Sequence, residues 1–220
     1  MSMRLSRVNG TPNLGVNAAV SESLAFIPPD AEPLFQSDLE EALGVRVLRT
    51  TVAGSHVVGS LLALNSYGAA VSELANASEL EIIGQFLPVV LIPDKLNAAG
   101  NNVLINDHGA IVNPEMGDAA VKELARVLNV EVVRSAIAGC NTVGSVCRCT
   151  NKGCVCSTDA TDDDLAVLKD VLGVEAARTT VNHGSQYVGA GIVANSKGAL
   201  IGDGTTPIEM GKIEDGLVLY

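Results

Sequence analysis

The segment Gly54-Ser-His-Val-Val-Gly59 indicates a repeat architecture, because the same spacing of glycines and apolar residues returns along the chain. Gly139-Cys-Asn-Thr-Val-Gly144 and Gly184-Ser-Gln-Tyr-Val-Gly189 repeat it, Gly10-Thr-Pro-Asn-Leu-Gly15 is a diverged version, and Asn-Ala-Ala-Gly100 fills the remaining place. The closing glycines stand at positions 15, 59, 100, 144 and 189. Self-similarity at a fixed period of roughly 44 residues is typical of repeat architectures. Five copies account for all 220 residues.

Each copy carries the same order of structural signals. A segment from Asn to Gly, such as Asn65-Ser-Tyr-Gly68, follows the closing glycine. It is predicted to form a hairpin turn, because Asn and Gly tolerate the positive φ of tight turns. Capping residues predict where the helices begin: Ser37, Ser78, Asp118, Thr161 and Thr206. A last strand is predicted after the helix, at residues 49–52, 134–137 and 178–181. Each copy is therefore predicted to form a strand, hairpin, strand, helix and strand.

The two ends of the chain are predicted to meet. A copy of roughly 44 residues is too small to bury a core alone, so the copies must pack on one another. The fifth copy lacks its last strand, and Leu5-Ser-Arg-Val8 precedes the first copy as such a strand would. We expect an α/β fold with one domain of five repeats in a closed ring. The expected boundaries are 9–52, 53–93, 94–137, 138–181 and 182–220, with residues 1–8 closing the fifth repeat.

Composition restricts the classes of function. The formal net charge is −11, aromatic residues make up 3% of the chain and Trp is absent, which disfavours phosphate binding and base stacking. Residues 1–20 contain no apolar run long enough for a signal-peptide core, so a soluble cytoplasmic protein is expected. Five cysteines, an odd number, argue against a disulfide framework.

Phrases spread in order along the chain resemble the translation initiation factor 6 family of archaea and eukaryotes, whose fold is the five-unit pentein. They are Asn13-Leu-Gly15, Thr50-Thr-Val-Ala-Gly54, Ala99-Gly-Asn101, Leu128-Asn-Val-Glu131-Val, Val143-Gly-Ser145, Thr150-Asn-Lys-Gly153, Val188-Gly-Ala-Gly191 and Thr205-Thr-Pro-Ile-Glu209. The resemblance implies a monomeric, non-enzymatic factor without cofactors. Such a factor binds the large ribosomal subunit, blocks its joining to the small subunit and has a role in large-subunit maturation.

The resemblance also implies a contact surface. In the family it faces an L14-type ribosomal protein, near the sarcin–ricin loop and an L24-type protein, and it gathers around the residues that follow the repeated glycines. Asn101 matches the family wording best, whereas Ser60 stands where eukaryotic members often have Arg, and Val146 replaces an aromatic residue. Val16, Ser145 and Ala190 join by repeat symmetry alone. The alternative for small residues here is tight packing around the ring axis.

Two other kinds of chemistry remain open. Cys147, Cys149, Cys154 and Cys156 flank one hairpin, so that Cys147 would oppose Cys156 and Cys149 would oppose Cys154. Four thiols on one face suit a zinc site, but the matching positions in other copies are apolar, which favours core packing. Pentein folds also host guanidine-modifying hydrolases, which need a Cys nucleophile assisted by His; the chain offers His56, His108 and His183.

Overall fold

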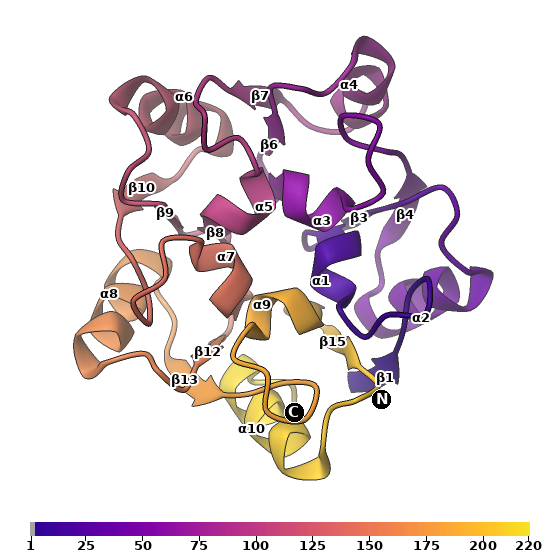
Figure 1. Ribbon diagram of the computed structural model, residues 1–220, viewed down its shortest axis with the longest axis vertical. Helices are drawn as coiled ribbons and strands as arrows, with labels where there is room; N and C mark the ends of the chain where they lie inside the picture. Colours follow the sequence, from indigo (N-terminus) through magenta and orange to yellow (C-terminus); the bar gives the residue numbers. More distant parts are fainter. Residues whose placement is uncertain (1–2) are drawn as a thin grey trace.

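The computed structural model describes residues 3–220, which form five three-stranded sheets arranged around a common axis (Figure 1). The sheets consist of β2 (Ala19–Val20), β3 (Leu24–Ile27) and β4 (Arg46–Arg49); β5 (Leu62–Leu64), β6 (Ala69–Ser72) and β7 (Val89–Ile92); β8 (Val103–Ile105), β9 (Gly109–Val112) and β10 (Glu131–Arg134); β11 (Cys147–Cys149), β12 (Cys154–Ser157) and β13 (Ala176–Thr179); and β14 (Ile192–Asn195), β15 (Gly198–Gly202) and β1 (Met3–Ser6). Each sheet is an antiparallel hairpin extended by one parallel strand. The predicted five-repeat α/β architecture is confirmed.

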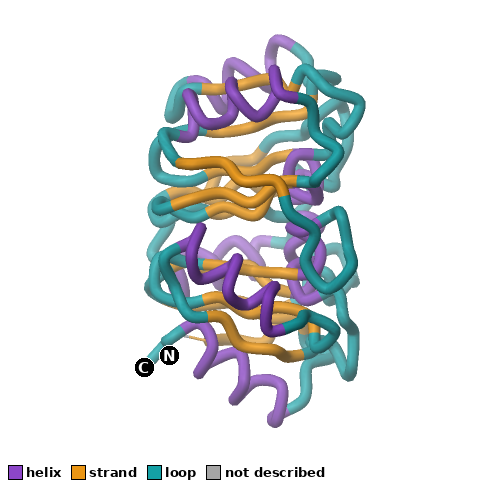
Figure 2. Tube along the Cα trace, turned by 90° about the vertical axis from the view of Figure 1, so that its left-hand side faces the viewer, coloured by secondary structure: helices purple, strands orange, loops and turns teal. Residues whose placement is uncertain are grey.

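Helices of two lengths accompany the sheets. Five single-turn helices surround the axis in Figure 1: α1 (Leu14–Asn17), α3 (Val58–Leu61), α5 (Ala99–Asn102), α7 (Val143–Val146) and α9 (Val188–Gly191). Five longer helices lie at the periphery: α2 (Pro33–Leu43), α4 (Ala77–Gly84), α6 (Asp118–Leu128), α8 (Asp162–Leu172) and α10 (Pro207–Leu217). Figure 2 shows the strands running from the short helices at one end of the axis towards hairpin turns at the other. The short helices were not predicted from the sequence.

The N-terminal strand belongs to the fifth sheet. β1 pairs with β15 in parallel, with Leu5 opposite Ile201. The strand covers Met3–Ser6 instead of residues 5–8, because Val8 forms an isolated bridge with Thr11.

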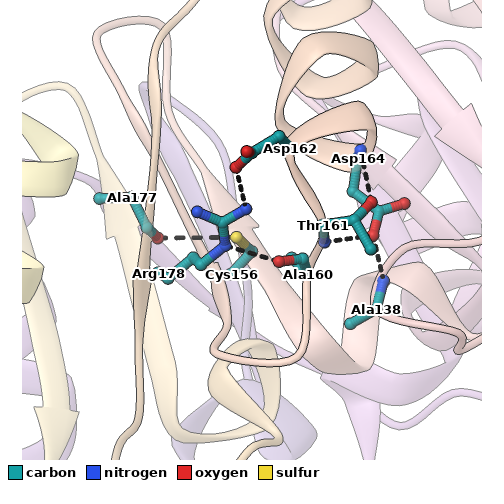
Figure 3. A network of polar contacts seen from close by, with 8 residues as sticks. All are labelled: Ala138, Cys156, Ala160, Thr161, Asp162, Asp164, Ala177 and Arg178. Carbon is teal, nitrogen blue, oxygen red and sulfur yellow. Dashed lines mark hydrogen bonds and ion pairs between the residues drawn. The ribbon is translucent and has the colours of Figure 1, made fainter.

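The same shift corrects the other predicted last strands. β4 and β10 end at the arginine where the prediction began them, β13 ends one residue past its arginine, at Thr179, and the residues that follow lead into isolated bridges. The arginine side chain leaves the strand and turns back towards the start of its helix. In Figure 3, Arg178 donates to the Ala160 carbonyl oxygen and to the Asp162 carboxylate, 2.6 Å from Nη2 to Oδ1.

Three of the five predicted helix starts are wrong. α2 begins at Pro33 rather than after Ser37, since proline suits the first helical turn. α4 is capped by Asn76, whose side chain accepts from the amide of Glu79, so the predicted cap Ser78 lies inside the helix. Asp118 is the first residue of α6 and not its cap. Capping boxes begin α8 and α10 at the predicted Thr161 and Thr206.

Each hydrophobic core is shared by two neighbouring repeats. Leu39 of α2 lies in one core with Leu200 of β15, so the first helix packs against the fifth sheet. Ile83 of α4 likewise shares a core with Phe26 of β3, from the preceding repeat. A repeat taken alone would expose one face of its sheet and the apolar face of its helix. The repeats therefore stabilise one another.

The repeated closing glycines pack against one another around the axis. A Cβ atom added at Gly59 would lie 2.2 Å from the Gly15 carbonyl oxygen, and one at Gly100 would lie 1.7 Å from that of Gly59. Gly144 meets Gly100 and Gly189 meets Gly144 in the same way. A Cβ at Gly15 would lie 2.1 Å from the Gly189 oxygen, which joins the first short helix to the last. Only glycine permits this approach of backbone to backbone.

Buried asparagines in the hairpins link three of the five pairs of neighbouring repeats. The Nδ2 of Asn65 donates to the carbonyl oxygens of Asn106 and Leu128 in the next repeat, at 3.2 and 2.9 Å. Asn106 and Asn195 make the same kind of bridge to the repeats that follow them. The hydroxyls of Thr150 and Ser21, at this position in the fourth and first repeats, bond within their own hairpins.

We expect Thr150→Asn to raise the free energy of unfolding by about 1–2 kcal/mol, because the new amide would bridge to the fifth repeat through two hydrogen bonds. The urea midpoint measures this gain. Asn106→Thr is the matched reverse change, and it should lose a similar amount at the neighbouring bridge. If the Thr150→Asn protein is less stable than the parent, the new amide does not form the expected hydrogen bonds to the fifth repeat, and the prediction is wrong.

Candidate functional site

The structure brings five of the six candidate contact residues to equivalent places at one end of the axis. Each is the third residue of a short helix: Val16, Ser60, Asn101, Ser145 and Ala190. In Figure 1 the five helices that carry them encircle the centre of the same face. Val146 is the last residue of α7. We call this end of the molecule, formed by α1, α3, α5, α7 and α9, the short-helix face.

Exposure differs among the six residues. Val16, Asn101, Ser145 and Ala190 are half-buried. Ser60 is 9% exposed, and Val146 is 5% exposed and packs in the core of the fourth repeat. The packing alternative therefore describes Val146 and the repeated glycines, whereas four of the candidates keep part of their surface on the short-helix face.

Polar side chains on this face have hydrogen-bonding capacity to spare. Within residues 3–220, the side chains of Asn101, Ser60 and Ser145 make no hydrogen bond, although Asn101 uses its backbone amide to bind Ala98. Asn102, the next residue, differs: it is 4% exposed, and its amide nitrogen donates to two carbonyl oxygens of the preceding loop. The side chain of Asn102 thus stabilises the preceding loop, whereas that of Asn101 keeps its hydrogen-bonding groups available.

Tyr187 is a candidate that sequence reasoning missed. It precedes α9 and is 60% exposed. A groove of about 320 Å³ lies beside it, lined by Ala138, Cys140, Val146, Ser157, Asp159, Gln186 and Tyr187. Val146 thereby lines an open groove although its own side chain is almost covered. One signal in the sequence could have identified Tyr187: it is an aromatic residue directly before the repeated apolar–Gly pair, here Val188-Gly189, in a chain with few aromatic residues.

Carboxylates at the helix starts hold the turns that precede the short helices. Glu79 accepts from the amides of Ala53 and Gly54, both at 2.8 Å, and these two residues have φ of 56° and 70°. Glu209 accepts in the same way from the amides of His183 and Gly184, at 3.2 and 2.8 Å.

The fourth repeat uses a shorter carboxylate for the same contact. Figure 3 shows Asp164 accepting from the Ala138 amide at 3.2 Å and from the Thr161 amide at 2.8 Å. The capping pattern in the sequence identifies Asp164 and Glu209 as helix-start residues, but it gives no sign of this second partner. These carboxylates connect the peripheral helices to the short-helix face.

The protein should lose stability between pH 4.5 and pH 2 because of Glu209. Burial alone raises the pKa of this carboxyl, but hydrogen bonds from Thr180, Thr206 and Gly184 outweigh it and lower the pKa from 4.5 to about 2. Since the unfolded chain binds the proton more readily, the stabilisation is complete above pH 4.5 and is lost as the pH falls through about 2. The loss amounts to about 3 kcal/mol.

Urea midpoints measured across this pH range test the prediction. Glu209→Gln should be less stable at pH 7 and should show a flatter dependence below pH 4.5. Asp215→Asn, at an exposed position of the same helix, serves as the control and should keep the parent's profile. Identical profiles for the parent and Glu209→Gln would contradict the assignment.

The four hairpin cysteines lie in register as predicted, Cys147 opposite Cys156 and Cys149 opposite Cys154. All four are buried in one hydrophobic core, and burial raises the pKa of Cys149 to about 12 and that of Cys156 to about 11. The Cys149 thiol donates to the Ile105 carbonyl oxygen at 3.1 Å. Within residues 3–220, no group of three or more His, Cys, Asp or Glu residues is placed to hold a metal ion. These features describe neutral thiols packed as small apolar side chains.

The contacts of His56, His183 and Cys140 are made with other residues. His56 pairs with Asp30 through Nδ1, at 2.9 Å, and both side chains are about half exposed. His183 lies in the left-handed turn held by Glu209. The Cys140 sulfur contacts the Thr142 hydroxyl at 3.2 Å. In the part of the chain that the structure describes, no hydrogen bond joins a cysteine sulfur to a histidine ring.

Comparison with known proteins places this five-repeat fold in a family. The model of the eIF-6 family matches residues 3–216, almost the whole chain. The chain belongs to the eIF-6 family. Family membership agrees with the resemblance seen in the sequence.

Individual relatives extend the match over nearly their full lengths. The chain is 42% identical to Translation initiation factor 6 of Methanocorpusculum labreanum over 211 residues, covering 94% of this chain and 95% of the relative. It is 39% identical to the factor of the same name from Methanosarcina mazei, with 98% of each covered. For Thermoplasma acidophilum the identity is 39%, with 93% and 94% covered. None of the helices formed by residues 3–220 of this family member is long and apolar enough to cross a membrane.

Proposed function

We propose that the protein binds the large ribosomal subunit and prevents it from joining the small subunit, with a further role in large-subunit maturation. Membership of the eIF-6 family over residues 3–216 is the observation that carries the proposal. The mechanism is occlusion: a single domain of five repeats in a closed ring occupies the joining surface as a monomer in the cytoplasm. No bond is made or broken, and neither a cofactor nor a metal takes part.

The short-helix face is the proposed contact surface. Its polar side chains at Asn101, Ser60 and Ser145 supply unused hydrogen-bonding groups, and Val16 and Ala190, on the adjacent helices α1 and α9, supply apolar area beside them. Tyr187 and the groove floored by Val146 provide an aromatic anchor beside a hollow, a combination enriched in the centres of protein interfaces. The proposed partners are an L14-type ribosomal protein and the neighbourhood of the sarcin–ricin loop and an L24-type protein.

Rigidity of the surface supports blocking by occlusion. The five helices are joined by glycine-to-glycine contacts, and the turns that lead into three of the repeats are tied to helix-start carboxylates. A preorganised surface loses little conformational entropy on binding. The net charge of −11 favours encounter with a basic ribosomal protein, while it disfavours broad contact with rRNA phosphates.

Sucrose-gradient sedimentation of purified archaeal subunits tests the proposal. Large subunits incubated first with the protein should fail to form joined ribosomes when small subunits are added, and the protein should sediment with the large subunit alone. In the order-of-addition control, the small subunits are incubated with the protein first. The amount of protein is one that the large subunits, added afterwards, bind completely. Joined ribosomes at undiminished yield, under saturating protein, would overturn the proposed function.

A further inference from the structure

One charged residue occupies a position that is apolar in every other repeat. Arg148 is the central residue of β11 and pairs with Val155. The same place in the inner strand of the other hairpins is taken by uncharged residues: Ala19, Ala63, Leu104 and Val193. Repeat symmetry therefore gives no structural reason for a guanidinium here.

The Arg148 side chain lies in the centre of the molecule. Its strand neighbours Cys147 and Cys149 point into the fourth core, so Arg148 points to the opposite side of the strand. There it lines a narrow central cavity of about 30 Å³ with the backbone of Gly59, Gly100 and Gly144 and with apolar side chains of the inner strands. That volume exceeds the roughly 10–15 Å³ that one water-sized particle requires.

The guanidinium is poorly satisfied by the protein. Nη2 donates to the Gly189 carbonyl oxygen at 2.9 Å. Nε is enclosed and has no hydrogen-bond partner, the only buried side-chain nitrogen or oxygen in residues 3–220 in this condition. Nη1 makes no hydrogen bond to the described chain either. Most of the five N–H donors that an arginine carries are thus unused.

The positive charge also lacks a counter-charge in its cavity. None of the residues that line the cavity is Asp or Glu. Burial lowers the pKa of Arg148 from 12.5, yet an arginine side chain remains protonated in proteins. The carboxylates of Glu22 and Asp107 line the adjoining cavity at the hairpin end, and each is occupied by hydrogen bonds there, Glu22 with Ser196 and Asp107 with Ser66. Arg148 is half-buried, and a charge withdrawn from water in part without a counter-charge is costly, so a mobile ion is the expected partner.

We propose that the central cavity binds one small monovalent inorganic anion of about the size of chloride, held by the unused N–H groups of Arg148. The narrow cavity admits a particle close to the size of water and excludes bulky organic anions. The site lies beneath the short-helix face and is separate from the contact surface proposed above. The proposal therefore stands whether or not the protein binds ribosomal subunits.

Bromide supplies a direct probe, because its anomalous scattering marks its position in a crystal. Crystals of the parent protein grown or soaked in sodium bromide should show an anomalous peak within hydrogen-bonding distance of a guanidinium nitrogen of Arg148. The peak should be lost in Arg148→Leu, which copies the residue found at Leu104. A parent crystal with no bromide in the cavity, or a peak that persists in Arg148→Leu, would overturn the proposal.

Thermal unfolding in solution provides the second readout, and it uses the parent protein even if Arg148→Leu does not fold. At constant ionic strength, replacing sodium gluconate by sodium chloride should raise the melting temperature of the parent progressively, as expected for a ligand of the native state. Arg148→Leu or, if needed, Arg148→Met should show no such rise. An equal response of parent and variant, or none in the parent, contradicts the anion site.

Discussion

Replacing Gly100 by alanine is expected to destabilise the protein by about 3 kcal/mol or more, the largest effect predicted for a single methyl group. The added Cβ would lie 1.7 Å from the Gly59 carbonyl oxygen and 3.0 Å from that of Leu62. Both obstacles are backbone atoms of the neighbouring repeat, so no side-chain rotation can relieve the clash. The repeats would have to separate at the axis, where five such contacts meet.

The change in urea midpoint at unchanged m-value measures this loss. Gly211→Ala is the matched control, since Gly211 lies inside α10 and nothing stands within 4 Å of a Cβ added there. Alanine in a helix interior is favoured over glycine, so this variant should gain about 0.5–1 kcal/mol. The same chemical change is therefore expected to have opposite signs at the two positions. A Gly100→Ala protein as stable as the parent would refute the described packing at the axis.

Asn101→Arg is expected to weaken binding to large ribosomal subunits by at least about 30-fold, which corresponds to about 2 kcal/mol. The larger side chain would project from α5 into the centre of the proposed contact surface, and the added positive charge would face a basic partner. Folding should be kept, because the Asn101 side chain makes no hydrogen bond within residues 3–220. Co-sedimentation titrations with large subunits measure the affinity.

Gln85→Arg is the control for this experiment. It introduces the same charge at an exposed position at the end of α4, on the periphery of the molecule. Arginine is favourable near a helix C-terminus, so the control should fold normally and bind as the parent does. If Asn101→Arg binds as tightly as Gln85→Arg, Asn101 lies outside the contact surface. Loss of binding in both would point to net charge and not to the short-helix face.

The repeat period was readable from the sequence because glycine spacing reports a backbone contact. Gly15, Gly59, Gly100, Gly144 and Gly189 are required wherever two short helices touch, so their positions mark each repeat. The hairpins were equally clear, since their turn residues are chemically restricted. The short helices were missed because four residues are too few to show a helical period. Their existence depends on packing at the axis and not on local propensity.

The candidate face could be predicted, but the behaviour of individual side chains could not. Symmetry placed Val16, Ser145 and Ala190 beside Asn101, and the structure puts all four at equivalent helix positions. Val146 follows Ser145 by one position, which turns its side chain into the fourth core. The predicted start of α4 was wrong because two capping residues, Asn76 and Ser78, lie close together in the sequence. Only the three-dimensional path of the loop determines which of the two caps the helix.

The pairing of β1 with β15 has a consequence for how the chain is made. Residues 3–6 are translated long before their partner strand, residues 198–202. Until then the edge of the N-terminal segment has no native neighbour, and closing a loop of nearly the whole chain is entropically unfavourable. Completion of the fifth sheet must therefore await translation of β15, and this seam is where a nascent chain that has not reached β15 would be most open to aggregation.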